Sequence, residues 1–279
     1  MTHSVDPGRT ATPAEPEAPH HPPPRSSAAT GTVACPAASA GAAAVIVETV
    51  QGEGGLRAAR PAWLRELEQL CRAHGVLLIV DDVQAGCGRT GTFFSFEEAG
   101  IVPELVCVSK SISGYGLPMA LTLLRPELDV WAPGQHNGTF RGHNAAFVTA
   151  TAALEKFWTD DAFARTVRQR AQQLAHGLGQ VAALVDGACV QGRGLLAGVR
   201  FPDPATAGQV AAAAFERHLL VETSGSRDEV LKTMPALTIS REELDEGLDV
   251  LLDATCAVLR RGAREDAVRG VPVGAEGAA

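Results

Sequence analysis

The chain has 279 residues, of which 46% are hydrophobic, so it is long and apolar enough to bury a sizeable core. A net charge of −8 argues against a nucleic-acid surface, because phosphate contacts need clustered Lys and Arg side chains. Six scattered cysteines without C-x-x-C spacing predict neither a zinc site nor a disulfide framework, and no apolar run reaches the ~18 residues that span a bilayer. We therefore expect a cytoplasmic protein that acts on small molecules, with no metal, nucleic-acid or membrane partner.

Both ends of the chain are predicted to lack fixed structure. The leader, 1–42, is rich in Pro and Ala, and its first 40 residues contain no Ile, Leu, Phe, Trp or Tyr. Such a segment cannot bury enough apolar surface to offset the entropy of ordering, so we expect it to be disordered. A transit peptide is the alternative, although acidic residues dilute its Arg and Ser. The last segment, 263–279, is predicted to be a flexible tail.

Short apolar runs alternate with a helical pattern over 43–155, which predicts an α/β domain built on a mostly parallel sheet. Strands are expected at 43–48, 76–82, 104–110 and 119–124. Between the first two, apolar residues recur at i, i+4, i+7 and i+8 from Trp63, with Pro61 before them and Gly75 after them. This spacing predicts one amphipathic helix.

A smaller α+β domain is predicted over 156–262. A long helical stretch, 144–184, leads into it, and the Asp pair at 160 and 161 is the expected break. Further strands are expected at 195–201, 219–223 and 229–239, with helices at 206–217 and 241–260. Ser240 followed by Glu243 predicts a capping box at the start of the last helix.

The glycines from Gly86 to Gly91 match the G-x-G-x-x-G fingerprint of dinucleotide-binding turns. That fingerprint needs its first Gly directly after the strand, and a helix whose N-terminus meets the pyrophosphate. Here 81–85 intervene, with two acids where phosphate would sit, and no long amphipathic helix follows Gly91. We therefore interpret these glycines as a shaped loop, and a nicotinamide enzyme is the less favoured alternative.

Polar residues end three of the predicted strands: Glu48 ends the first, Asp81 the second and Lys110 the third. Ligands of open α/β sheets bind outside the carboxyl ends of the strands, so these groups should converge on one crevice. A lysine at the end of a buried strand can lose its proton through desolvation and act as an amine nucleophile. Pyridoxal phosphate needs such a lysine and an acid on its pyridinium nitrogen, which Asp81 and Lys110 can supply. A structural ion pair is the alternative that spacing leaves open.

Four ordered motifs carry a family resemblance. They resemble successive motifs of the class III pyridoxal-phosphate-dependent aminotransferases: VETVQGEGG (47–55), LLIVDDVQAGCGRTG (77–91), LVCVSKSISGYGLPMAL (105–121) and HNGTFRGHN (136–144). The resemblance implies an α/β protein of fold type I, with part of the large cofactor-binding domain over 43–155 and the small C-terminal α+β domain over 156–262. Within the family, these motifs are most similar to the branch that moves an amino group between diaminobutyrate and 2-oxoglutarate in ectoine synthesis.

The resemblance also implies roles toward pyridoxal 5'-phosphate, position by position. It makes Lys110 the lysine that carries the cofactor and the catalytic base, and Asp81 the partner of the pyridine nitrogen. Gln84 is expected to bond the phenolic oxygen, and Val83 to pack on one face of the ring. Thr139 matches a threonine that reaches the cofactor phosphate of the neighbouring subunit, which implies a homodimer or a higher homo-oligomer.

Three further residues are expected to contact the amino donor and the 2-oxo acid. Glu53 matches a glutamate that pairs with an arginine and gates between the two substrates in related ω-aminotransferases. At the position of that arginine the chain has Lys232, which lacks the planar fork of a guanidinium. Arg141 is another candidate for a substrate carboxylate, with a phosphate or structural contact as the alternative.

The resemblance covers only part of the family's fold. The turn that cradles the cofactor phosphate and the aromatic residue on the second ring face have no counterpart before the first predicted strand. We therefore expect a truncated copy with exposed strand edges, and an inactive chain is one consequence that truncation allows. The alternatives are a non-catalytic interaction module and an aminotransferase for another ω-amino acid.

Overall fold

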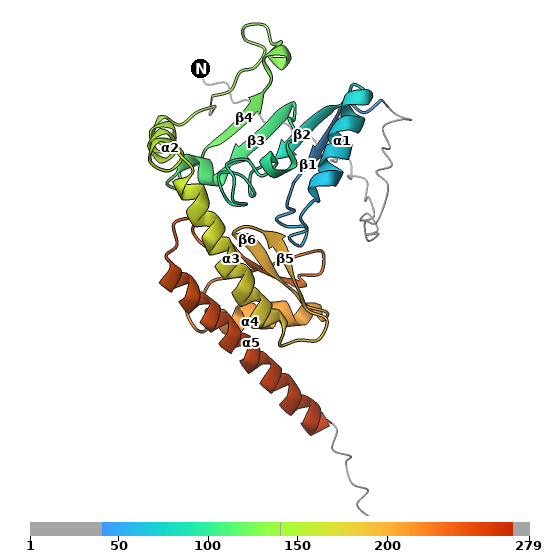
Figure 1. The fold of residues 1–279 in the computed structure, drawn as a ribbon, viewed down its shortest axis with the longest axis vertical. Coiled ribbons are helices and arrows are strands. Elements are labelled where there is room, and N and C mark those ends of the chain that lie inside the picture. Colours follow the sequence, from blue (N-terminus) through green and yellow to red (C-terminus); the bar gives the residue numbers. More distant parts are fainter. Residues whose placement is uncertain (1–40, 140, 270–279) are drawn as a thin grey trace, which may run out of the picture. The chain divides into compact units, whose positions relative to one another are not determined.

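Two four-stranded sheets organise the computed structural model, which describes residues 41–139 and 141–269 (Figure 1). These residues all belong to one compact unit, Cys35–Ala279. The predicted leader lies outside the described residues except for its last two positions, 41 and 42.

The first sheet has the strand order β1-β2-β3-β4. Its strands are β1 (Ala44–Val47), β2 (Leu77–Asp81), β3 (Leu105–Ser109) and β4 (Ala120–Leu124). The first three pair in parallel and β4 pairs antiparallel to β3, so the predicted, mostly parallel α/β sheet is confirmed. The predicted amphipathic helix is present as α1 (Pro61–Ala73), which buries Leu67 and Cys71 of the predicted face together with Leu64, while Trp63 and Leu70 are half-buried.

Strands β1 and β4 form the two edges of this sheet, and among the described residues no further strand pairs with either. Ile46 of β1 is 61% exposed and Leu123 of β4 is 41% exposed. Apolar side chains on an open edge strand offer a surface for pairing with more chain. The expectation of exposed edges is therefore confirmed for the described part of the chain.

Short 3-10 helices lie between β2 and β3 (Glu97–Ala99), between β3 and β4 (Lys110–Ser113) and after β4 (Pro126–Leu128). Two longer helices come next, α2 (Asn144–Phe157) and α3 (Ala162–Ala182). They are separated at 158–161, which confirms the predicted break at the two aspartates.

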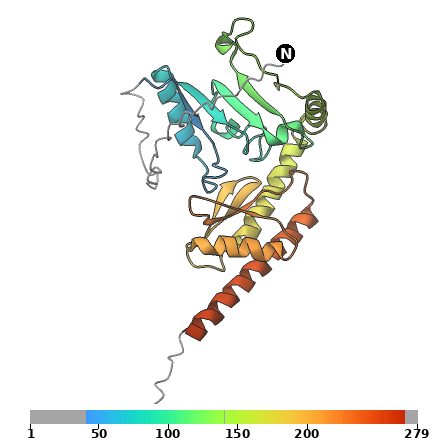
Figure 2. The same cartoon turned by 180° about the vertical axis from the view of Figure 1, so that it is seen from behind.

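The second sheet is antiparallel throughout and has the order β5-β6-β8-β7. Its strands are β5 (Cys189–Arg193), β6 (Leu196–Arg200), β7 (Glu222–Ser224) and β8 (Val230–Thr233). Helices α3 and α4 (Pro204–Phe215) pack against it, and α5 (Arg241–Arg269) packs on these two helices (Figures 1 and 2). Their apolar faces enclose one core with Phe201, Leu195 and Leu231 of the sheet region.

Several predicted boundaries in this region were wrong. Strand β5 was not predicted, because its sequence CVQGR is more typical of a turn. Gly192 is nevertheless required there, since a Cβ at that position would lie 2.2 Å from the Leu196 carbonyl oxygen. The strand expected at 229–239 ends at Thr233, and Pro235 follows, which has no N–H to donate to a sheet.

Three other elements differ in length or position from the prediction. Strand β7 covers Glu222–Ser224 rather than 219–223, and α4 begins at Pro204, where Asp203 accepts a bond from the Ala205 N–H at 3.1 Å. Helix α5 continues to Arg269 instead of ending at 260. Its last turns lack apolar periodicity but contain Arg, Ala and Glu, which favour helix.

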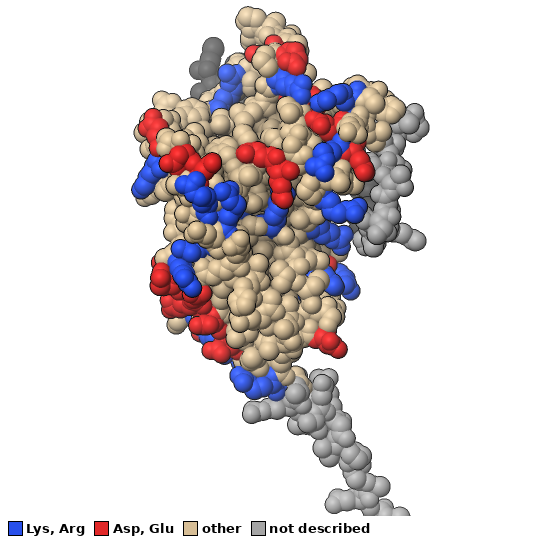
Figure 3. Space-filling model, viewed as in Figure 1, with Lys and Arg blue, Asp and Glu red and all other residues tan. Residues whose placement is uncertain are grey.

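Charged side chains of both signs are interspersed on the face drawn in Figure 3. None of the helices in the described ranges is long and apolar enough to cross a membrane.

The capping box at α5 offers a test of the fold. The Glu243 N–H donates to Ser240 Oγ at 3.1 Å, and the Ser240 N–H donates to Glu243 Oε2 at 2.9 Å, as the sequence predicts. We expect Ser240→Ala to lower the free energy of unfolding by about 1 kcal/mol, because one helix N–H loses its acceptor. Urea unfolding measures the change, and Ser240→Thr, which keeps a hydroxyl, is the control. Identical midpoints for Ser240→Ala and the parent chain would contradict the assignment.

Candidate active site

A tight loop after β1 places Glu53 at its tip. Strand β1 is followed by Glu48, whose Oε2 accepts the Gly52 N–H at 2.8 Å, so this acid orders the loop. Two backbone bonds between Gln51 and the 56–57 segment close the turn, and Val50 pairs with Ala58 at its base. The loop therefore presents Glu53 in a fixed place rather than on a mobile segment.

Strand β7 holds this loop against the second sheet. Ser224 Oγ accepts the Gly55 N–H at 3.0 Å and donates to the Gly52 carbonyl oxygen at 2.9 Å. The Gly225 N–H donates to the Glu53 carbonyl oxygen at 3.1 Å. Ser224 is buried, so these bonds are shielded from water. One hydroxyl thus fixes the position of Glu53 relative to β7 and β8.

Lys232 of β8 is the centre of a charged cluster. Its Nζ lies 2.9 Å from Glu53 Oε1 and 3.2 Å from Glu222 Oε2, and Gln84 Nε2 donates to the same Glu53 oxygen at 2.9 Å. The Lys232 side chain is only 3% exposed, while Glu53 and Glu222 are 73% and 67% exposed. The structure thus brings together three predicted residues, Glu53, Gln84 and Lys232.

Sheet register explains why Lys232 faces this loop. Lys232 is opposite Glu222 on β7 and opposite Gly198 on β6, so these three positions share one face of the sheet. A Cβ at Gly198 would lie 2.1 Å from the Leu231 carbonyl oxygen and 2.9 Å from a Leu56 methyl group, so the neighbouring strand requires the glycine first and the loop second. The Lys232 side chain is covered on this face, and its ammonium meets the carboxylates.

The cluster changes the protonation of its members. Hydrogen bonds from Lys232 and then Gln84 lower the pKa of Glu53, and the positive charge of Lys110 adds to this effect. Burial by itself lowers the pKa of Lys232, but its hydrogen bonds to Glu53 and Glu222 outweigh burial and raise that pKa above its usual value. The buried ammonium is therefore kept charged by the two acids.

Asp81 and Asp82 have different surroundings at the end of β2. Asp81 is half-buried, and its Oδ1 accepts the Val83 N–H at 3.1 Å. Asp82 is 1% exposed and accepts hydrogen bonds from the Ser95 N–H, at 3.0 Å, and from the Ser95 hydroxyl. Burial raises the pKa of Asp82 despite these bonds. Asp82 is therefore structural, while Asp81, together with the half-buried Val83 and Gln84, is accessible to a ligand.

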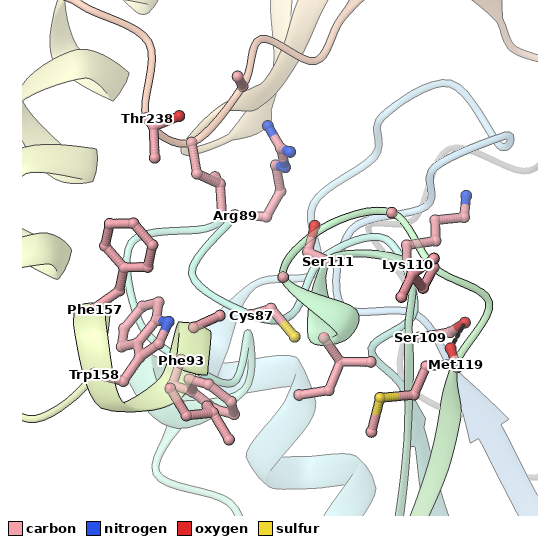
Figure 4. A pocket seen from close by; sticks show the side chains of 18 of the residues that line it. Cys87, Arg89, Phe93, Ser109, Lys110, Ser111, Met119, Phe157, Trp158 and Thr238 are labelled. Atoms are coloured by element: carbon pink, nitrogen blue, oxygen red, sulfur yellow. Dashed lines mark hydrogen bonds between the residues drawn. The ribbon is translucent and has the colours of Figure 1, made fainter. Parts of the chain in front are cut away.

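Lys110 lies where β3 gives way to a 3-10 helix, one strand beyond Asp81. Its backbone has φ 51°, in the left-handed region, so the chain turns sharply at this residue. The side chain is exposed, which contradicts the burial expected at the end of this strand. Figure 4 shows it pointing away from Phe157 and Trp158, while Ser109 bonds the Met119 carbonyl oxygen at 2.7 Å. The described residues therefore leave this amine open to solvent and to a ligand.

Two predicted residues lie apart from the cluster. Thr139 and Arg141 are both exposed, in the segment before α2. The Arg141 guanidinium donates to the His136 carbonyl oxygen, a contact within that segment. No described contact joins either residue to Glu53 or Lys232.

A pocket of about 690 Å³ opens beside Lys110 (Figure 4). Phe93, Phe157 and Trp158 line its apolar side, and Arg89 and Thr238 line its polar side. The Arg89 guanidinium donates to the Leu195 and Pro235 carbonyl oxygens, and burial lowers its pKa to about 10. The pocket therefore combines aromatic walls with a buried cation.

The glycines of the G-x-G-x-x-G spacing serve packing. A Cβ on Gly88 would lie 2.5 Å from the Trp158 ring, and Gly88 and Gly91 both have positive φ. Turns and a short 3-10 helix follow Gly91, where a dinucleotide site needs a helix N-terminus. Burial raises the pKa of the Cys87 thiol to about 12, which disfavours the reactive thiolate.

Sequence reasoning missed Glu222, Ser224 and Arg89. Glu222 and Ser224 flank Thr223 in a short strand, and only the pairing register shows that they face the loop of Glu53. Arg89 could have been noticed as the single charge in the glycine-rich stretch 83–91. Among the described residues, no group of His, Cys, Asp and Glu is arranged to hold a metal ion.

Comparisons with known proteins identify the family of the chain. A family model described as aminotransferase class-III matches residues 32–255. A diaminobutyrate--2-oxoglutarate transaminase of Nocardia farcinica is 59% identical over 217 residues, which cover 77% of this chain and 50% of that protein. The chain thus spans about half the length of the curated relatives that it matches.

Solved structures of aminotransferases share the fold of this chain. N-acetylornithine aminotransferase of Stenotrophomonas maltophilia matches with a TM-score of 0.69 and 31% identity, over 78% of this chain and 57% of that one. Ornithine aminotransferase of Toxoplasma gondii matches with a TM-score of 0.72 and 30% identity, over 78% of this chain and 51% of that one. In that Toxoplasma gondii structure, PLP partially occupies the active site.

The lowered pKa of Glu53 predicts a pH dependence of stability. A carboxyl whose pKa falls on folding stabilises the protein above its ordinary pKa of 4.5, and this contribution is lost as pH falls through the folded pKa. We expect Glu53→Gln to be less stable than the parent at neutral pH, by less than about 1 kcal/mol because Glu53 is mostly exposed. The difference should vanish in acid.

Urea unfolding across this pH range measures the effect. Glu66→Gln removes an exposed acid of α1 and serves as the control, with no such pH-dependent difference expected. A Glu53→Gln difference that stays constant down to strong acid would refute the ion pair as its cause.

Proposed function

The chain belongs to the class III aminotransferase family, and from this premise we propose that it carries one part of the active site of a pyridoxal-phosphate-dependent transaminase. Its substrates are L-2,4-diaminobutyrate and 2-oxoglutarate, and its products aspartate 4-semialdehyde and glutamate. The main support is the cluster in which Gln84, Glu53 and Lys232 meet beside the strand ends that carry Asp81 and Lys110. The names of the relatives supply the substrate pair.

The residues present fit the cofactor. Asp81 and Lys110 stand at the carboxyl ends of two adjacent parallel strands, where an acid and an amine can face the same ligand. Gln84 Oε1 is buried without a hydrogen-bond partner among the described residues, so the amide has unused bonding capacity at this place. Asp81 would hold the pyridine nitrogen, Gln84 the phenolic oxygen and Val83 one ring face. When bound, pyridoxal phosphate supplies an electron sink next to the amino nitrogen.

Lys110 has two tasks in this proposal. Its Nζ is the amine that attaches the cofactor covalently, and after displacement by the donor it is free to act as a base. It then takes a proton from the substrate carbon that bears the amino group, a role that requires an accessible and mobile side chain. Lys110, whose long side chain is exposed just after β3, meets that requirement.

Lys232 and Glu53 account for the two different substrates. A diamino acid presents an extra ammonium group, which suits the exposed Glu53 carboxylate. A 2-oxo dicarboxylate presents an extra carboxylate, which suits Lys232, the cation beneath the acids. Arg141 is a second candidate for a substrate carboxylate.

The remaining parts of the proposal concern assembly and setting. Thr139 lies on an exposed segment, from which it can reach the cofactor phosphate of a neighbouring subunit in a homodimer. We place the enzyme in the cytoplasm and its reaction in ectoine biosynthesis. The proposed domains are 43–155 for the cofactor and 156–262 for the small domain.

Cofactor attachment tests the proposal directly. The sequence holds three lysines, Lys110, Lys156 and Lys232. We expect pyridoxal phosphate to give a long-wavelength absorbance band that Lys110→Ala abolishes and that Lys156→Ala, at an exposed lysine of α2, retains. Borohydride reduction and peptide mapping should place the label on Lys110. A missing band, or a label on all three lysines alike, would rule out a specific cofactor site and leave the non-catalytic alternative.

A further inference from the structure

Two carboxylates share one buried ammonium in the charged cluster, and they are not equivalent. Glu53 accepts hydrogen bonds from both Lys232 and Gln84, and its backbone is bonded by Gly225. Among the described residues, Glu222 has Lys232 as its side-chain partner, at the longer distance of 3.2 Å. Glu222 is therefore the more weakly held of the two acids.

The location of Glu222 also lets it move. It lies on β7, which is an edge strand of the second sheet, and its side chain is 67% exposed. Rotating it into water breaks one charge-assisted bond, whereas releasing Glu53 breaks two. When Glu222 rotates away, Lys232 stays bonded to Glu53, so the buried ammonium is not left unpaired.

An anion cannot reach Lys232 without displacing one of these acids. Glu53 and Glu222 take two of the three donors of the ammonium, and the Lys232 side chain is only 3% exposed, so the third donor is covered by protein. A carboxylate that binds beside Glu222 without displacing it would meet a like charge at close range. Entry of an acid substrate therefore requires an exchange of counter-ions.

We propose that Glu222 is the displaceable counter-ion of Lys232, and that it sets how strongly the site accepts a dicarboxylic 2-oxo acid relative to a diamino acid. An incoming carboxylate takes the place of Glu222 beside the ammonium while Glu53 stays bonded. With Glu222 in place, the two acids outnumber the lysine and favour an ammonium-bearing donor. This inference rests on the proposed function, because it assumes that Lys232 receives substrate carboxylates.

Binding to the intact chain tests the proposal without the cofactor. Glutarate, a five-carbon dicarboxylate without a reactive carbonyl, serves as the acid probe, and L-2,4-diaminobutyrate as the amine probe. Isotopic labelling of lysine gives signals from only three residues, which substitution to Arg assigns. The Lys232 side-chain signal then reports on each titration.

We expect Glu222→Gln to tighten glutarate binding about three- to tenfold and to weaken diaminobutyrate binding. Glu155→Gln removes an exposed acid of α2 and is the charge-matched control, with neither affinity changed. Glu222→Ala, which also removes the carboxylate, should repeat the glutarate result. A merely structural role of Glu222 would change both affinities in the same direction.

Equal glutarate affinity in Glu222→Gln and the parent would overturn the proposal, as would a titration that leaves the Lys232 signal in place. Loss of cooperative unfolding in both Glu222 variants would also overturn it, because a displaceable acid cannot be required for folding. The Lys110-dependent absorbance band reports on the proposed function independently. A band without the Glu222 effect removes only this inference, whereas the effect without a band removes only the cofactor assignment.

Discussion

A buried ammonium group is stable only if acids or carbonyl groups surround it, and in this molecule that requirement joins the two sheets. Lys232 is almost wholly buried, so the strand that carries it must be met by carboxylates. One comes from the neighbouring strand through register, and the other comes from a loop that follows the first strand of the first sheet. Removing either acid leaves the lysine more costly to bury, so the charge fixes where the loop must lie.

Ser224 holds the loop of Glu53 against β7 through hydrogen bonds to the loop backbone. Val50 and Leu56 of the loop pack against Leu196 and Val230, while the glycines at 52, 54 and 55 add conformational entropy to the free chain. The serine hydroxyl satisfies both an N–H and a C=O group of the loop. Because both are buried, they would otherwise lack partners. Gly198, the glycine opposite Lys232, leaves room for the Leu231 backbone of the adjacent strand and for Leu56 of the loop.

The sequence predicted the polar residues at the strand ends better than the contacts that hold the loop of Glu53 against the second sheet. Asp81 and Lys110 could be identified because strand ends are marked by the change from apolar to polar residues, and the structure puts both at such ends. Gln84 followed from the family resemblance alone. Register could not be read in the same way, since Glu222 and Ser224 belong to a three-residue strand without a clear period. Strand β5 was missed for a similar reason. Its Gly192 is needed because the Leu196 backbone lies close to it across the sheet, and this contact cannot be seen in the sequence. The break between α2 and α3 was predicted because two aspartates mark it locally.

The choice of lysine at position 232 has a physical consequence. An arginine would hold a single carboxylate through two parallel bonds, and that carboxylate would fix the plane of the guanidinium. A lysine ammonium is a point charge whose three donors point in different directions, so two separate acids can share it. Exchange of one partner then needs no rearrangement of the other. The cluster of Lys232 with Glu53 and Glu222 is in this respect suited to alternate between substrates of opposite charge, because one acid keeps the lysine paired while the other position is vacated for a ligand.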